Sequence, residues 1–201
     1  MLVELTKYFL QSGFKISNIL LLARFRNLIE EFRTRKVENY YNLIIKQLSE
    51  TYKKDPVEVN RFINEWINIR PLKYLINQCS PQIKNAILYL DSKKIEWTFY
   101  SDHYPNDKLK TLGIDYATAF YSAMPGINCL KPNPEAVEII LAQYKISNKE
   151  AVIVGDRKEV DGRLAANAGT YFVRYRASKK SDNLLKDIRL LVDSPRDLKN
   201  L

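Results

Sequence analysis

Glycine is scarce in this chain and unevenly placed. Six of the 201 residues are glycine, and only Gly13 comes before Gly113. Glycine marks tight turns, so few sharp turns are expected in the first half. The first ninety or so residues show the apolar spacing of helices, whereas the rest alternates between strand-like and helix-like stretches. The sequence therefore divides into two parts of different architecture.

Long apolar runs and paired cysteines are also missing. The longest purely aliphatic run, Ile19 to Ala23, is far shorter than the roughly 20 residues that span a membrane. The N-terminal stretch has no basic region followed by an apolar run and a cleavage site, so no signal peptide is expected. Cys79 and Cys129 lack CxxC spacing. These features predict a cytoplasmic protein with two reduced thiols.

Basic residues outnumber acidic ones, 32 to 23, which gives a net charge of +9. One interpretation is attraction to nucleic acid or anionic lipid. The other is a solvated surface that favours small phosphorylated substrates. The basic residues are dispersed, with only short clusters such as Lys179–Lys180. Dispersed charge favours the second interpretation, so we expect a small phosphorylated metabolite as partner, with no nucleic acid and no membrane.

Four helices are predicted in the first half. The third has the clearest start, with Asp55 as N-cap, Pro56 in the first turn and Glu58 three residues after the cap. Its apolar face is Val59, Phe62, Ile63, Trp66 and Ile67. The other three helices carry Ile16 to Phe32, Tyr40 to Tyr52, and a stretch that starts at Ser80-Pro81 with Ile83, Ile87 and Leu88 facing inward.

Four strands are predicted in the second half: Ile95–Asp102, Ala151–Asp156, Thr170–Tyr175 and Ile188–Ser194. The apolar run AVIVG is typical of a buried parallel strand. Helical stretches lie between them, at Asp107–Leu112, Pro134–Tyr144 and Val160–Ala168. This alternation predicts a doubly wound parallel sheet, in which ligands bind beyond the carboxyl ends of the strands.

Chemistry-bearing residues occur in three short segments of the second half. Ser101 ends a strand, Lys131 stands in KPNP before a helix, and Asp156 and Asp161 stand in GDRKEVD after a strand. Taken singly, each has an ordinary structural explanation: a turn serine, a solvated lysine, or a tight strand-to-helix turn.

The order of these segments resembles the haloacid dehalogenase (HAD) superfamily. Strand–Ser, then Lys-Pro-x-Pro, then strand–GDxxxxD opening a helix, is similar to motifs II, III and IV of that family, over residues 83–201. The resemblance implies an α/β class, with a Rossmann-like doubly wound parallel sheet and an α-helical cap domain. The implied domains are a core at 81–201, a cap at 14–80, and residues 1–13 as the remnant that follows a missing first core strand.

The resemblance also implies a role for each residue. Ser101 would donate a hydrogen bond to a phosphate oxygen, and Lys131 would supply a positive charge beside the phosphate. Asp156 would hold Mg²⁺, and Asp161 would support it, since Mg²⁺ prefers oxygen ligands. Asp102 stands where the family often has Asn. The single histidine, His103, is a candidate substrate contact or, as we favour, a solvated loop residue.

The nucleophile motif of the family, DxDx[TV], is missing. By the resemblance, it would stand on the central strand of the sheet, between the strands that carry motifs II and IV. The chain contains no Asp-x-Asp, and its first aspartate is Asp55, in the helical half. Either a strand that bears the motif precedes Met1, which we favour because the other motifs are intact, or the protein is a non-catalytic relative. In that relative, MLVEL serves as a strand or the gap in the sheet stays open. We therefore expect a Mg²⁺-dependent phosphatase for a small phosphomonoester, inactive without the missing segment. The alternative is a binding or regulatory protein on the same scaffold.

Overall fold

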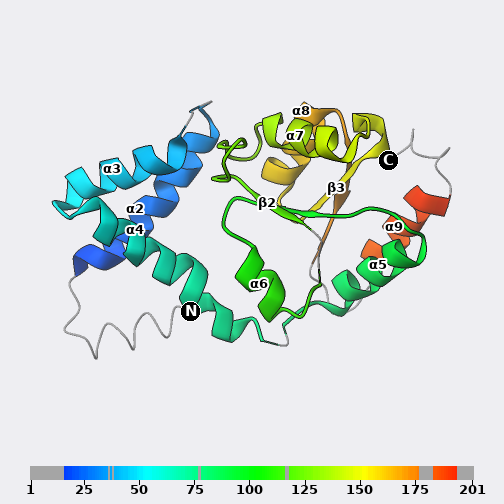
Figure 1. Cartoon of the computed structure of the whole chain (residues 1–201), viewed down its shortest axis with the longest axis horizontal. Coiled ribbons are helices and arrows are strands. Elements are labelled where there is room, and N and C mark those ends of the chain that lie inside the picture. The colour runs from blue at the N-terminus through cyan, green and yellow to red at the C-terminus, as the bar shows by residue number, and fades with distance from the viewer. Residues whose placement is uncertain are drawn as a thin grey trace.

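A computed structural model describes residues 16–35, 37, 39–76, 78–115, 118–176 and 183–193. The predictions for residues 1–13, for MLVEL as a strand and for the tail beyond Asp193 fall outside the described residues. An all-helical part lies beside an α/β part in Figure 1. The all-helical part comes first in the chain, as the apolar spacing and the placement of glycine predict.

The all-helical part comprises α2 (Ile16–Arg33), α3 (Tyr40–Tyr52), α4 (Pro56–Asn64), the π-helical turn η1 (Glu65–Ile69) and the 3₁₀ turn η2 (Arg70–Tyr74). Asp55 caps α4 as predicted, because its carboxylate accepts hydrogen bonds from the amides of Val57 (2.8 Å) and Glu58 (3.3 Å). The core of this part includes Leu28, Ile44 and Ile63, and Leu130 of the α/β part joins the same cluster. The two parts therefore share apolar packing.

The α/β part begins with α5 (Pro81–Ser92) and ends with α9 (Asn183–Asp193). Between them lie β1 (Phe99–Ser101), α6 (Asn106–Thr111), β2 (Ala119–Tyr121), α7 (Glu135–Tyr144), the 3₁₀ turn η3 (Asn148–Glu150), β3 (Val152–Gly155), the π-helical turn η4 (Lys158–Gly162), α8 (Arg163–Ala168) and β4 (Tyr171–Arg174).

The strands form two parallel pairs, β1 with β2 and β3 with β4. Side chains of a strand alternate between its two faces, and helices cover both faces of β3 and β4. Ile153 packs with α7 and α8 on one face, and Val173 packs with α5 and α9 on the other. Tyr100 of β1 packs against the same α7–α8 cluster as Ile153. The predicted α/β class with parallel strands is confirmed.

The predicted burial of the AVIVG strand is only partly correct. Val152 and Val154 of β3 are 40% and 44% exposed. Within the described part of the chain, no strand pairs with the edges of β1 and β3 that face away from β2 and β4. The sheet is therefore divided between its two pairs, at the position where the resemblance places the missing strand.

Three details of the sequence prediction are wrong. Residues 188–193 are part of helix α9 and not a strand, since Leu184, Ile188 and Leu191 are buried at the helical spacing of four and three residues. Strand β2 was not predicted, because its three residues are too few to show a period. Leu88 was expected to face inward in α5 but is 66% exposed, and Ala86 is buried instead.

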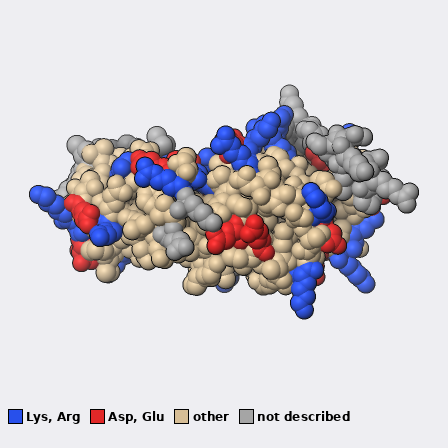
Figure 2. All heavy atoms as spheres, turned by 90° about the horizontal axis from the view of Figure 1, so that it is seen from above, with Lys and Arg blue, Asp and Glu red and all other residues tan. Residues whose placement is uncertain are grey.

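Charged side chains on the face shown in Figure 2 stand in small groups along the length of the molecule, without a continuous basic band. No helix in the described ranges is long and apolar enough to cross a membrane.

A truncation of α2 tests the helical core. Leu28 is fully buried, so Leu28→Ala should lower the free energy of unfolding by about 3 kcal/mol, from lost apolar burial plus a cavity. Leu20→Ala on the same helix is the matched control, since Leu20 is 53% exposed and should change stability by less than about 1 kcal/mol. Urea denaturation measures both, and equal losses would contradict the placement of α2.

Candidate active site

Four residues singled out by the sequence stand at strand ends or in the turns beside them. Ser101 is the last residue of β1, and Asp156 follows the last residue of β3. Lys131 stands in the loop before α7, and Asp161 stands in the π-helical turn η4. Parallel strands thus bring segments that are distant in sequence to one edge of the sheet. We call this edge the rim, and it carries Ser101, Lys131, Asp156 and Asp161.

Lys131 and Asp161 meet at this rim. The Lys131 Nζ lies 3.0 Å from the Asp161 Oδ1, and both side chains are nearly buried. The backbone amide of Arg157 donates to the other carboxylate oxygen of Asp161 at 3.1 Å. Gly155 makes this arrangement possible, because a Cβ at position 155 would overlap the side chain of Asp161. The glycine of the GDxxxxD motif therefore has a steric role.

Asp102 forms a second buried ion pair. Its Oδ2 lies 2.7 Å from Nη1 of Arg33, on helix α2. Its Oδ1 accepts hydrogen bonds from the hydroxyl of Ser122 (2.8 Å) and the amide of Lys131 (3.3 Å). Burial raises the pKa of Asp102, but the charges of Arg33 and Lys131 outweigh burial and hold that pKa below its usual value. Asp102 is therefore a carboxylate engaged on both oxygens.

Sequence reasoning did not single out Arg33. Its Nη1 also donates to the backbone oxygen of Lys131 at 3.0 Å, so one helical side chain holds two loops of the rim. Asp102 and Lys131 lie 69 and 98 positions after Arg33 in the chain. No local pattern marks such a partner. The one available signal is Asp102 itself, because a carboxylate where the family often has Asn needs a cation nearby once it is buried.

Ser101 and Asp156 are less constrained. The Ser101 hydroxyl oxygen accepts a hydrogen bond from the backbone amide of His103 at 3.1 Å. Among the described residues this hydroxyl donates to no protein acceptor, so its proton is available to a ligand. Asp156 is exposed, and within those residues its carboxylate makes no hydrogen bond or ion pair with Ser101, Lys131 or Asp161.

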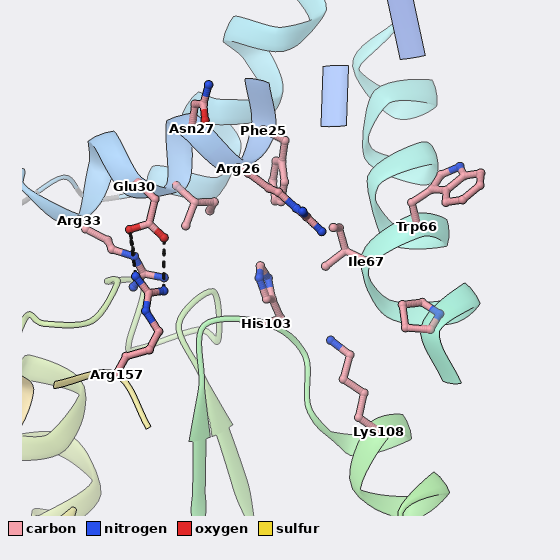
Figure 3. Close-up of a pocket in the computed structure, with 12 residues that line it drawn as sticks. Phe25, Arg26, Asn27, Glu30, Arg33, Trp66, Ile67, His103, Lys108 and Arg157 are labelled. Carbon is pink, nitrogen blue, oxygen red and sulfur yellow. Dashed lines mark hydrogen bonds and ion pairs between the residues drawn. The ribbon is translucent and has the colours of Figure 1, made fainter. Parts of the chain in front are cut away.

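A cavity of about 380 Å³ lies between the all-helical part and the rim (Figure 3). Three of its lining residues form hydrogen bonds with residues of the rim. Arg33 contacts the Lys131 carbonyl, the Arg157 amide contacts Asp161, and the His103 amide contacts Ser101. The volume is within the usual range for small-molecule pockets, roughly 300–1,000 Å³. The cavity is therefore suited to hold a ligand that reaches the rim.

His103 is part-buried and lines this cavity, in contrast to the solvated loop residue that we favoured from sequence. Its ring lies 6.4 Å from that of Phe25. Burial, followed by the nearby charge of Lys108, lowers the pKa of His103 to about 4. The imidazole is therefore neutral at pH 7 and can contact a ligand without adding charge.

A divalent metal fits the described residues only in part. Asp156 is exposed and can bind a cation, whereas both oxygens of Asp161 are engaged by Lys131 and Arg157. The described residues contain no group of three or more His, Cys, Asp or Glu side chains placed to hold a metal ion. One available carboxylate does not complete a magnesium site, which needs further ligands from substrate, water or another segment.

The described residues form an α/β fold with a polar rim at the carboxyl ends of its parallel strands and a cavity between that rim and the helical part. The chain belongs to the haloacid dehalogenase-like hydrolase family, whose sequence profile matches residues 16–175.

Two known proteins are similar to this chain, one in fold and one over part of its sequence. One solved structure, a 2-haloacid dehalogenase from Pseudomonas syringae pv. tomato DC3000, has 18% sequence identity and a TM-score of 0.59, over 94% of this chain and 88% of that one. It shows the fold alone. A probable D-glycero-D-manno-heptose-1,7-bisphosphate 7-phosphatase from Thermoplasma volcanium is 36% identical over 69 residues, which is 33% of this chain. The match spans 47% of the length of that relative.

A substitution at Gly155 tests the packing beneath the ion pair. Gly155→Ala should displace Asp161 from Lys131 and lower the free energy of unfolding by about 1–3 kcal/mol, as overpacking does. Gly162→Ala is the matched control, because its Cβ would lie 3.3 Å from an edge atom of Phe172 and needs only a small adjustment. Equal stability of the two variants in urea would contradict the close approach at Gly155.

The pH dependence of stability tests the burial of His103. The folded-state pKa of about 4 lies below the ordinary value of 6.5, so the unfolded chain binds a proton that the folded chain does not. Stability should therefore fall between pH 6.5 and pH 4, by about 3 kcal/mol in total from this group. His103→Gln should remove that part of the loss.

Urea denaturation at pH 7 and pH 5 measures the difference between the two proteins. His103 is the only histidine, so the variant isolates its contribution. Carboxylates titrate in both proteins and cancel in the comparison. Identical pH profiles would show that His103 is solvated.

Proposed function

We propose that this chain carries the phosphate-binding part of a Mg²⁺-dependent phosphatase that acts on a small phosphomonoester. The observation that carries the proposal is the meeting of Lys131 and Asp161 at 3.0 Å beside the cavity. Phosphoryl transfer depends mainly on cations and hydrogen-bond donors held in place before the reaction. A nearly buried ammonium, held by a carboxylate, supplies such a charge.

Lys131 and Ser101 would bind the phosphate. One N–H of the Lys131 ammonium is directed to Asp161, and an ammonium has three such donors. The remaining donors can contact a phosphate oxygen. The Ser101 hydroxyl, held by the His103 amide, would donate its proton to another oxygen of the same phosphate. The Lys131 Nζ also lies 5.0 Å from the centre of the Tyr100 ring, which further fixes its position.

Mg²⁺ belongs to the same proposal. Asp156 would hold it, and Asp161 would position the surrounding groups through Lys131 and the Arg157 amide. The ion would supply positive charge against the developing negative charge of the phosphoryl group. The named activity of the Thermoplasma relative favours a phosphorylated sugar as substrate, on the basis of a match to 47% of that protein.

The nucleophile is the open part of the proposal. Asp102 cannot supply it, because Arg33, Ser122 and the Lys131 amide occupy both of its oxygens. We infer that the reactive aspartate would stand on a strand between β1 and β3, where the described sheet is divided. Without such a strand the chain would bind phosphomonoesters and not hydrolyse them, which is the alternative function: a binding or regulatory protein.

An assay with two proteins tests both forms of the proposal. The first is the 201-residue chain, and the second is the same chain extended at its N-terminus by a strand that carries DxDGT. The extended protein should hydrolyse p-nitrophenyl phosphate with Mg²⁺, and the 201-residue chain should not. Asp156→Ala in the extended protein should remove the dependence on Mg²⁺, and Lys131→Met should lower kcat by at least about 100-fold, as loss of one preorganised charge does.

The outcomes separate the two functions. An extended protein that is folded by circular dichroism and still inactive favours the binding protein. Phosphate binding that does not change in Lys131→Met, measured by calorimetry on the 201-residue chain, would contradict both functions, since both place the phosphate on Lys131.

A further inference from the structure

Two cations of the cavity have no acidic partner among the described residues. The described lining includes the basic side chains of Arg26, Arg33, Lys108 and Arg157, and one acidic side chain, Glu30. Glu30 contacts Arg33 at 2.9 Å and Arg157 at 3.4 Å, so its carboxylate is shared between these two. Arg26 and Lys108 contact no carboxylate within the described part of the chain, and Lys108 donates to the neutral amide oxygen of Asn68 at 3.3 Å.

These two cations lie on the side of His103 away from Arg157. Figure 3 shows Arg26 of α2 and Lys108 of α6 with their charged ends directed toward the space beside His103, whereas Arg33 and Arg157 meet Glu30 elsewhere in the cavity. Lys108 and Arg26 both lower the pKa of His103, which indicates that their fields reach the same point. Burial also lowers the pKa of Lys108 itself. An anion placed there would relieve the mutual repulsion of the two cations.

The wall behind the two cations is apolar and locally irregular. Helix α4 changes to the π-helical turn η1 at Glu65, and this turn carries Trp66, Ile67 and Asn68. Ile67 lines the cavity and points toward Arg26 and His103, whereas the ring of Trp66 points away, with the Arg70 guanidinium over it (Figure 3). Asn68 holds Lys108. Single π turns within α-helices are frequent at functional sites, because they redirect side chains. The turn thus combines an apolar surface for a carbon skeleton with a fixed cation.

We propose that the substrate carries two acidic groups, one bound at the Lys131 rim and the other at an anion subsite made by Arg26 and Lys108. The proposal rests on the phosphatase function in placing the first group on Lys131. The second group is a phosphate or carboxylate joined to the first by a short carbon chain, which lies along Ile67. The subsite selects substrates and takes no part in bond cleavage.

Calorimetry on the 201-residue chain tests the subsite with matched probes. Glucose 6-phosphate and fructose 6-phosphate carry one phosphate, and glucose 1,6-bisphosphate and fructose 1,6-bisphosphate carry two. At least one bisphosphate should bind about tenfold or more tightly than its monophosphate, the change expected from one added charge-assisted contact. Arg26→Gln and Lys108→Met should each remove that gain and leave monophosphate affinity unchanged.

Each variant has a neighbour as control. Arg24, on the same helix as Arg26, is ion-paired with Glu31, and Lys110, on the same helix as Lys108, is exposed and outside the cavity lining. Arg24→Gln and Lys110→Met should keep the gain. A loss of equal size in these controls would mean general attraction to a basic surface, and would overturn the subsite.

Lys131→Met distinguishes a failure of the anion subsite from a failure of the phosphate site at Lys131, on which the subsite proposal rests. If both kinds of probe lose affinity in Lys131→Met and the bisphosphates show no gain in the unaltered chain, the subsite is wrong and the phosphate site stands. If monophosphate affinity is the same with and without Lys131, the phosphate site itself is wrong. Absence of binding for all four probes would count against both.

Discussion

Lys131 makes polar contacts with three separate parts of the chain, and the geometry of the site depends on them. Its side chain pairs with Asp161 after β3, its amide donates to Asp102 after β1, and its carbonyl accepts from Arg33 on α2. In the described sheet β1 and β3 are not joined by backbone hydrogen bonds, so these contacts connect the two strand pairs at the rim. They also attach the all-helical part to the same point.

The charges at this point are balanced in pairs, which makes their burial tolerable. Arg33 faces Asp102 and Lys131 faces Asp161, and each of these side chains is at most 15% exposed. Removal of one partner leaves an uncompensated charge, which costs about 3–5 kcal/mol in buried pairs. In the cavity the balance is incomplete, because Arg26 and Lys108 contact no carboxylate among the described residues. The excess positive charge is what makes the cavity suited to an acidic ligand.

Local patterns in the sequence were enough to predict much of this arrangement. The N-cap at Asp55, the α/β class and the segments that carry Ser101, Lys131 and Asp161 follow from spacing, composition and the resemblance to a known family. Contacts between distant segments could not be predicted in this way. Arg33 reaches Asp102 across 69 positions. The apolar spacing of α4 continues into residues 65–69, so the sequence gives no sign that the helix changes there to the π-helical turn η1. Residues 188–193 have the aliphatic composition of a strand, but Leu184, Ile188 and Leu191 are buried at the spacing of a helix.

The joining of the two strand pairs through Lys131 is open to a direct measurement. A double-mutant cycle compares the free energies of unfolding of the unaltered chain, Lys131→Met, Asp161→Asn and the double variant, in urea. If the ion pair joins the strand pairs, the two changes should be coupled by about 1–3 kcal/mol, since each single variant leaves the other charge buried alone. Effects that add to within about 0.5 kcal/mol would show that the two side chains act independently. That result would contradict the account of the rim.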